Sequence, residues 1–62
     1  MNMLDYQKMI IRKVSSSEKL FRKEIEKSFR WLEQEEIKYL KYWVLNNFYN
    51  DHPKTIHQLF EV

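Results

Sequence analysis

Residues Glu36 to Asn50 read EIKYLKYWVLNNFYN, and no other stretch constrains the fold as strongly. Placed on a helix at about 100° per residue, the stretch has one seam of apolar side chains suited to a core: Ile37, Leu40, Val44 and Phe48. Trp43 and Tyr39 extend this seam on one side, and most of the back of the helix is also apolar, covered by Leu45, Tyr49 and Tyr42. A helix that is apolar on nearly every side is buried on more than one side. Other helices of the chain, or a partner, must therefore cover it.

The length and composition of the chain limit how it can be stabilised. It has 62 residues, no cysteine, no glycine and one proline. A chain of this size buries only about 60% of the surface that it exposes when unfolded, so it folds alone with difficulty. Because cysteine is absent, disulfides and thiolate metal sites are excluded. Oligomerisation remains as a way to add to the stability of the small core. Because glycine is absent, tight β-hairpins and glycine-rich phosphate loops are not expected.

The stretches on either side of the aromatic helix predict further helices. The first is expected over residues 3–14, with Asn2 as its N-cap and with these core-facing side chains: Met3, Tyr6, Met9, Ile10 and Val14. Ser15 and Glu18 have the spacing of a capping box, which predicts that Ser15 caps a second helix running to Leu32. A flexible serine linker is the alternative interpretation. Pro53 is expected to start a short final helix, because proline suits the first helical turn.

The junction between the second and third helices is marked by a change of phase. The second helix has this apolar stripe: Phe21, Ile25, Phe29 and Leu32. The spacing then jumps by five residues from Leu32 to Ile37, which predicts a helix break within residues 32–36; one continuous helix is the alternative. The fold class expected for residues 1–62 is therefore all-α, a single small antiparallel bundle of three main helices plus a short C-terminal helix. The first helix is expected to lie across a hairpin of the second and third.

The titratable residues do not have the pattern of an active site. His52 and His57 lie five residues apart beside Asp51, but a zinc site needs three or four convergent ligands. Three acids precede the aromatic helix and are interpreted as favourable helix-start charges rather than an acid–base pair: Glu33, Glu35 and Glu36. We therefore expect a non-enzymatic protein with no cofactor, no metal site and no small-molecule substrate.

Charge is unevenly divided along the chain. Residues 1–31 carry eight Lys and Arg against four Asp and Glu, whereas residues 32–62 carry three against five. Ion pairs are expected from Glu18 to Arg22 and from Glu26 to Arg30. The second helix has one basic face, which could contact phosphates of a nucleic acid or could simply be solvated: Lys19, Arg22, Lys23, Lys27 and Arg30. The sequence has no stretch typical of a signal peptide or a membrane span, so no membrane contact and a cytoplasmic location are expected.

The end of the aromatic helix also resembles a known family. The segment from Leu45 to Pro53, LNNFYNDHP, is similar to the closing segment of the Hha/YmoA family of small nucleoid-associated modulators. The resemblance implies an all-helical fold and binding to a nucleoid-structuring protein. It covers this segment alone, and the chain departs from the family where an Asp-His pair is expected on the third helix, because Tyr42 and Trp43 occupy that region.

Two functional hypotheses follow from these observations. The first is a protein–protein interaction or self-association module, a homo-dimer or a complex with an unidentified protein, with these contact residues: Tyr39, Tyr42, Trp43, Leu45 and Tyr49. Its alternative is that the first and last helices cover those side chains within the monomer. The second is a nucleic-acid-associated modulator, a nucleoid or transcription accessory protein that uses the basic helix face.

Overall fold

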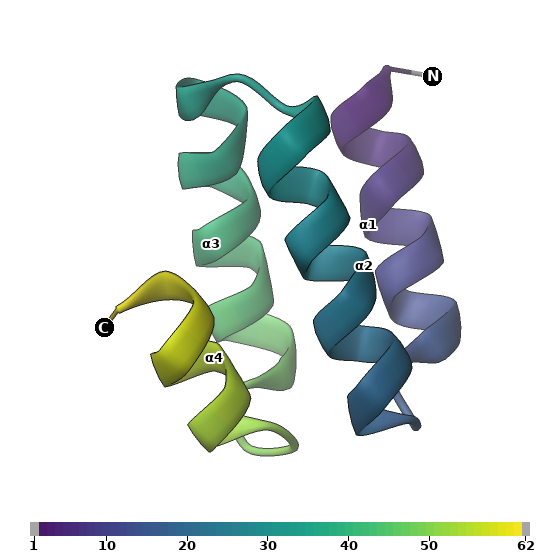
Figure 1. Cartoon of the computed structure of the whole chain (residues 1–62), viewed down its shortest axis with the longest axis vertical. Coiled ribbons are helices and arrows are strands. Elements are labelled where there is room, and N and C mark those ends of the chain that lie inside the picture. The colour runs from purple at the N-terminus through teal and green to yellow at the C-terminus, as the bar shows by residue number, and fades with distance from the viewer. Residues whose placement is uncertain (1, 62) are drawn as a thin grey trace.

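A computed structural model describes residues 2–61, which form four helices and no strand. The helices are α1 (Met3–Val14), α2 (Glu18–Trp31), α3 (Gln34–Phe48) and α4 (Pro53–Phe60). The expected all-α class is confirmed, while the terminal residues 1 and 62 of the expected domain lie outside the described residues. Figure 1 shows α1, α2 and α3 side by side, with α1 and α3 running in one direction and α2 in the other. The first helix therefore lies along the second helix rather than across a hairpin, and α4 packs against α2 and α3.

The core draws apolar side chains from all four helices. It consists of Ile11, Phe21, Ile25, Leu32, Leu40, Val44, Phe48 and Ile56. Phe21 of α2 meets Phe48 of α3 edge to face, with ring centroids 5.5 Å apart, a geometry that aromatic pairs prefer. Phe29 and Phe60 make a similar contact between α2 and α4 at 5.3 Å. The expected seam of the aromatic helix is thus the side that faces the core.

The inward face of α1 differs from the one expected. Its fully buried side chains are Gln7 and Ile11, whereas three of the side chains expected in the core are 38–44% exposed: Met3, Tyr6 and Met9. The reason is that the side of α1 that faces the core has a polar residue, Gln7, at its centre. Leu4, Gln7 and Ile11 follow one another at three- and four-residue steps, but Gln7 breaks the apolar pattern that the sequence displays.

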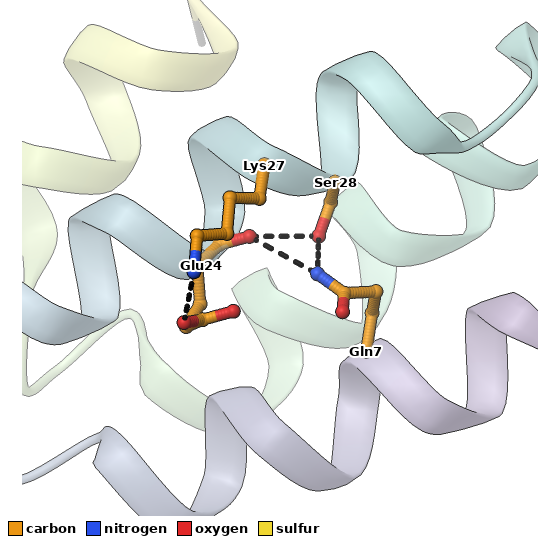
Figure 2. Close-up of polar contacts among 4 residues, drawn as sticks. All are labelled: Gln7, Glu24, Lys27 and Ser28. Carbon is orange, nitrogen blue, oxygen red and sulfur yellow. Dashed lines mark hydrogen bonds and ion pairs between the residues drawn. The ribbon is translucent and has the colours of Figure 1, made fainter.

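Gln7 is accommodated by a polar contact between α1 and α2, shown in Figure 2. Its Nε2 donates to Ser28 Oγ at 2.8 Å and to the Glu24 carbonyl at 3.3 Å. Ser28 Oγ in turn donates to the same carbonyl at 2.9 Å. The Oε1 atom of Gln7 is buried and accepts no hydrogen bond from residues 2–61. A buried acceptor without a donor destabilises the fold, so this contact fixes how α1 meets α2 at the expense of stability.

The serine run between α1 and α2 places the helix cap two residues later than expected. Ser17, not Ser15, is the N-cap, and its Oγ accepts from the Leu20 amide at 3.4 Å. Ser15 closes α1 instead, donating to the Arg12 carbonyl at 2.9 Å. All three serines can cap, so the choice depends on the backbone: Ser17 is extended, as an N-cap requires, while Ser15 is still helical.

The ion pairs on α2 also differ from those expected. Arg22 pairs with Glu26 at 3.2 Å, and Lys27 pairs with Glu24 at 3.2 Å. Glu18 accepts from the Thr55 hydroxyl at 2.7 Å and is therefore used to hold α4. Arg22 thus keeps an i,i+4 partner, but the partner is Glu26 on its C-terminal side, because Glu18 bonds to another helix.

The predicted break between α2 and α3 is confirmed. Leu32 and Glu33 are extended, and α3 begins at Gln34. A capping box forms here, because the side chain of Glu33 accepts from the Glu36 backbone and that of Glu36 accepts from the Glu33 amide at 3.1 Å. The acids that the sequence places before the aromatic helix therefore satisfy its first free amides.

The loop before α4 is bonded to the loop between α1 and α2, which lies at the same end of the bundle (Figure 1). His52 Nε2 donates to the Ser15 carbonyl at 2.6 Å, and its ring stacks on Phe21 with centroids 4.3 Å apart. Arg22 adds a bond from α2 to Gln58 of α4 at 2.9 Å. The final helix starts at Pro53, as predicted, and these contacts hold it on the core.

Candidate interaction surface

The five aromatic and aliphatic side chains expected to meet a partner do not all share one face of α3. Tyr39 and Tyr42 are 60% and 52% exposed. Leu45 is partly buried against the core. Tyr49 turns toward α4, where its hydroxyl is hydrogen bonded to His57 Nε2 at 2.7 Å. The helices α1 and α4 therefore do not cover Tyr39 and Tyr42, while Leu45 and Tyr49 have contacts within the chain.

Trp43 lies where α3 meets α1 and is bordered by two cations. Lys8 Nζ is 5.8 Å and Arg12 Cζ 5.6 Å from the centroid of its ring. At these distances a cation is attracted to the negative face of the indole. Another side of the ring packs edge to face against Phe48 at 5.3 Å. Trp43 thus joins the core to the surface, and its outer part lies between α1 and α3.

A shallow cleft opens beside Trp43. It has a volume of about 260 Å³ and is lined by Lys8, Met9, Arg12 and Trp43. Tyr39 precedes Trp43 by one helical turn and lies on the same side of α3, and Tyr42, three residues after Tyr39, lies next to Tyr39 on the helix surface. We call this surface the α1–α3 face and define it by Met9, Arg12, Tyr39, Tyr42 and Trp43. The sequence predicts the α3 residues of this face as contact residues, whereas it predicts Met9 in the core. Met9 lies on the surface because Gln7 and Ile11, on the other side of α1, face the core.

The basic face of α2 forms a second surface. All five of its cations are exposed: Lys19, Arg22, Lys23, Lys27 and Arg30. Arg22 and Lys27 are paired within the chain, but the other three make no ion pair among residues 2–61. A shallow cleft of about 230 Å³ lies between Lys23, Glu26, Lys27 and Arg30. The face therefore keeps free positive charge, although Glu26 lies within it.

The two histidines have roles in the fold, and they do not assemble a metal site. His52 contacts Phe21 and the Ser15 carbonyl, whereas His57 contacts Tyr49. Within residues 2–61 there is no group of three or more His, Asp or Glu side chains placed to hold a metal ion. None of the helices in this part of the chain is both long enough and apolar enough to cross a bilayer.

Comparison of the chain with protein-family models, with curated proteins and with solved structures finds no match. The resemblance of the segment from Leu45 to Pro53 to a nucleoid-associated family therefore receives no support from the family models. In the structure this segment is divided among the end of α3, a turn and the first residue of α4, and it includes the core residue Phe48. The inference of function accordingly depends on the chemistry of the two surfaces.

Proposed function

We propose that the chain is a self-association module that forms a homo-dimer, or a larger homo-oligomer, through the α1–α3 face. The observation that carries this proposal is the exposure of Tyr39 and Tyr42, at 60% and 52%, on the same helix as Trp43, which lines the cleft. Tyrosine, tryptophan, methionine and arginine are the side chains enriched at the centre of protein interfaces. The α1–α3 face consists of these four residue types.

The small size of the domain gives self-association a physical advantage. Within residues 2–61 the core holds eight buried apolar side chains, and a single core in a chain this short rarely supplies more than about 3–5 kcal/mol. Any contact made only by the folded state raises the free energy of unfolding by mass action. Covering Tyr39 and Tyr42 with a second copy would therefore stabilise the domain and remove an exposed apolar patch.

The proposal is tested by a paired substitution on the face and a control outside it. Tyr39→Glu with Tyr42→Glu should give a smaller sedimenting particle than the wild type and should abolish the dependence of melting temperature on protein concentration. Leu20→Glu is the control, because Leu20 is similarly exposed, at 47%, but lies on α2. The control should keep the wild-type mass. A doubly substituted chain that associates as tightly as the wild type would refute the proposal.

A second candidate function is nucleic-acid binding through the basic face of α2. It is favoured by the three cations on that face that have no ion-pair partner within residues 2–61: Lys19, Lys23 and Arg30. Three phosphate contacts would make duplex DNA affinity fall about 40-fold between about 50 and 200 mM salt. Lys19→Gln with Lys23→Gln should flatten that dependence. Absence of binding to duplex DNA at the lower salt concentration would eliminate this candidate.

The remaining expectations from the sequence stay predictions. They are a non-enzymatic role, a cytoplasmic location, and the absence of a small-molecule substrate. The α1–α3 face has no nucleophile beside a base, and its cleft is lined by two cations, a thioether and an indole. Such a cleft is suited to contact with another macromolecule rather than to acid–base chemistry, which needs groups that can exchange a proton near neutral pH.

A further inference from the structure

The α1–α3 face has charges of opposite sign at its two ends. Asp5 lies in the first turn of α1, four residues before Met9 and seven before Arg12, so these three side chains follow one side of the helix. Arg12 lies in the last turn of α1. The two acids of the first turn of α3, Glu35 and Glu36, stand at the same end of the bundle as Asp5 because α1 and α3 run in the same direction (Figure 1).

The charges at both ends of α1 face solvent in the part of the chain that the structure describes. Neither Asp5 nor Arg12 forms an ion pair among residues 2–61, and both are exposed. Arg12 lies over Trp43 at 5.6 Å, but a guanidinium that stacks on a ring keeps its N–H groups free to meet a carboxylate in its plane. A binding partner that offers an acid near Arg12 and a base near Asp5 would complement the charges of this face.

We propose that this partner is a second copy of the chain, docked antiparallel about a two-fold axis that passes close to Met9, so that Asp5 of each copy meets Arg12 of the other. This inference rests on the proposed function and adds the arrangement of the dimer. In a two-fold interface every contact occurs twice, with the partners exchanged. Seven residues separate Asp5 from Arg12, about 10.5 Å along the helix, and Met9 lies close to the midpoint.

The opposite charges at the two ends of the face exclude a dimer in which the two α1 helices are parallel. If the two copies met with α1 parallel to α1, Asp5 would face Asp5 and Arg12 would face Arg12. Like charges opposed across an interface cost several kcal/mol and reject the wrong alignment. In the antiparallel arrangement the apolar centre of one copy, with Met9 and Trp43, also covers the apolar centre of the other. The charges thus select the alignment, while the aromatic side chains supply the area.

A charge exchange between two chains tests this arrangement. Arg12→Glu places acids against Asp5 at both contacts of its homo-dimer, and Asp5→Lys places bases against Arg12 at both contacts. Each variant alone should have a homo-dimer Kd at least about tenfold above that of the wild type, equivalent to 1.4 kcal/mol. Mixed in equal amounts, the two variants should form a hetero-dimer of near wild-type affinity. In that hetero-dimer the introduced glutamate meets the introduced lysine at one contact, and the native Asp5 meets the native Arg12 at the other, so both contacts are attractive.

Matched controls separate this effect from a change in net charge. Lys54→Glu changes the net charge as Arg12→Glu does, and Asp51→Lys changes it as Asp5→Lys does, but both positions are exposed outside the α1–α3 face. The controls should dimerise as the wild type does and should show no preference for mixing. If Arg12→Glu lowers the helix content, Arg12→Gln removes the same contact and should still raise the Kd.

The outcomes distinguish this inference from the proposed function. A wild-type chain that stays monomeric overturns both. A wild-type dimer whose Kd is unchanged by Arg12→Glu and Asp5→Lys, with no preference for the hetero-dimer on mixing, overturns the arrangement and leaves self-association through another alignment. Weakened homo-dimers without recovery on mixing also overturn it, because both residues would then act on their own chain and not on each other across the axis.

Discussion

The buried amide of Gln7 offers a sharp test of how α1 is held on α2. We predict that Gln7→Leu combined with Ser28→Ala increases the free energy of unfolding. Both side chains are completely buried, and the substitutions remove their polar atoms while keeping the site filled. Replacing both members of a buried polar pair by apolar groups of similar shape is neutral or stabilising, whereas removing one member leaves the other without a partner.

The magnitude follows from the contacts of the two residues. The wild type loses about 1–3 kcal/mol to the buried Gln7 Oε1, and it gains about 0.5–1.5 kcal/mol from each of the bonds that Nε2 and Ser28 Oγ donate. The double variant loses all of these bonds, so the polar contributions favour the wild type by about 1 kcal/mol. Burying a leucine side chain at the same place adds about 1.5–3 kcal/mol. We therefore expect the double variant to be more stable by about 1 kcal/mol, which raises the melting temperature by roughly 4–8 °C.

The assay is urea and thermal unfolding followed by far-ultraviolet circular dichroism. Wild type, both single variants and the double variant complete a thermodynamic cycle, from which the coupling between Gln7 and Ser28 is obtained. All four chains are compared at the same low concentration, because self-association raises apparent stability. A double variant that is less stable than the wild type would refute the reasoning, because the Gln7 contact would then contribute more than the apolar burial that replaces it.

Further substitutions test the caps and the loop before α4 by the same unfolding measurements. Ser17→Ala should lower the free energy of unfolding by about 0.5–2 kcal/mol through loss of the α2 cap, whereas Ser15→Ala should change it by about 0.5 kcal/mol or less; a larger effect at Ser15 would contradict the assignment of the cap. His52→Ala should cost about 1–3 kcal/mol, because the bond to the Ser15 carbonyl and the stack on Phe21 are both lost. His52→Phe should recover part of that loss by restoring the ring; equal stability of the two variants would show that the stack contributes nothing.

The aromatic helix and its boundaries could be predicted from the sequence because they depend on local signals. The seam containing Leu40 and Val44 is visible as a periodic pattern, and the break after Leu32 is visible as a change of phase. Pro53 marks the start of α4. Each of these features is set by residues within one or two helical turns, which is the range over which sequence periodicity carries information.

The features that were predicted wrongly depend on contacts between helices. Gln7 could not be placed in the core from its polarity, because Ser28 and the Glu24 carbonyl that receive its hydrogen bonds lie on another helix. The cap moved from Ser15 to Ser17 within a run of three equivalent serines. Glu18 was expected to pair along α2 but contacts Thr55 of α4.

The candidate surface was predicted in part for the same reason. Tyr42 follows from the helical wheel, since it lies away from the core seam, whereas Tyr39 extends that seam on one side. The cations over Trp43 do not, because Lys8 and Arg12 reach the indole only when α1 and α3 lie in their observed register. Gln7 holds α1 on α2, and the error in the face of α1 concealed both Met9 and the two cations.

The mass of the wild-type chain in solution tests the central claim most directly. Sedimentation equilibrium from the low micromolar range to hundreds of micromolar should show the mass rising from that of the 7.9 kDa chain toward twice that value or more. The rise should be reversible on dilution and should be lost when Tyr39 and Tyr42 are both replaced by glutamate. A mass that stays at 7.9 kDa up to hundreds of micromolar would contradict self-association through the α1–α3 face.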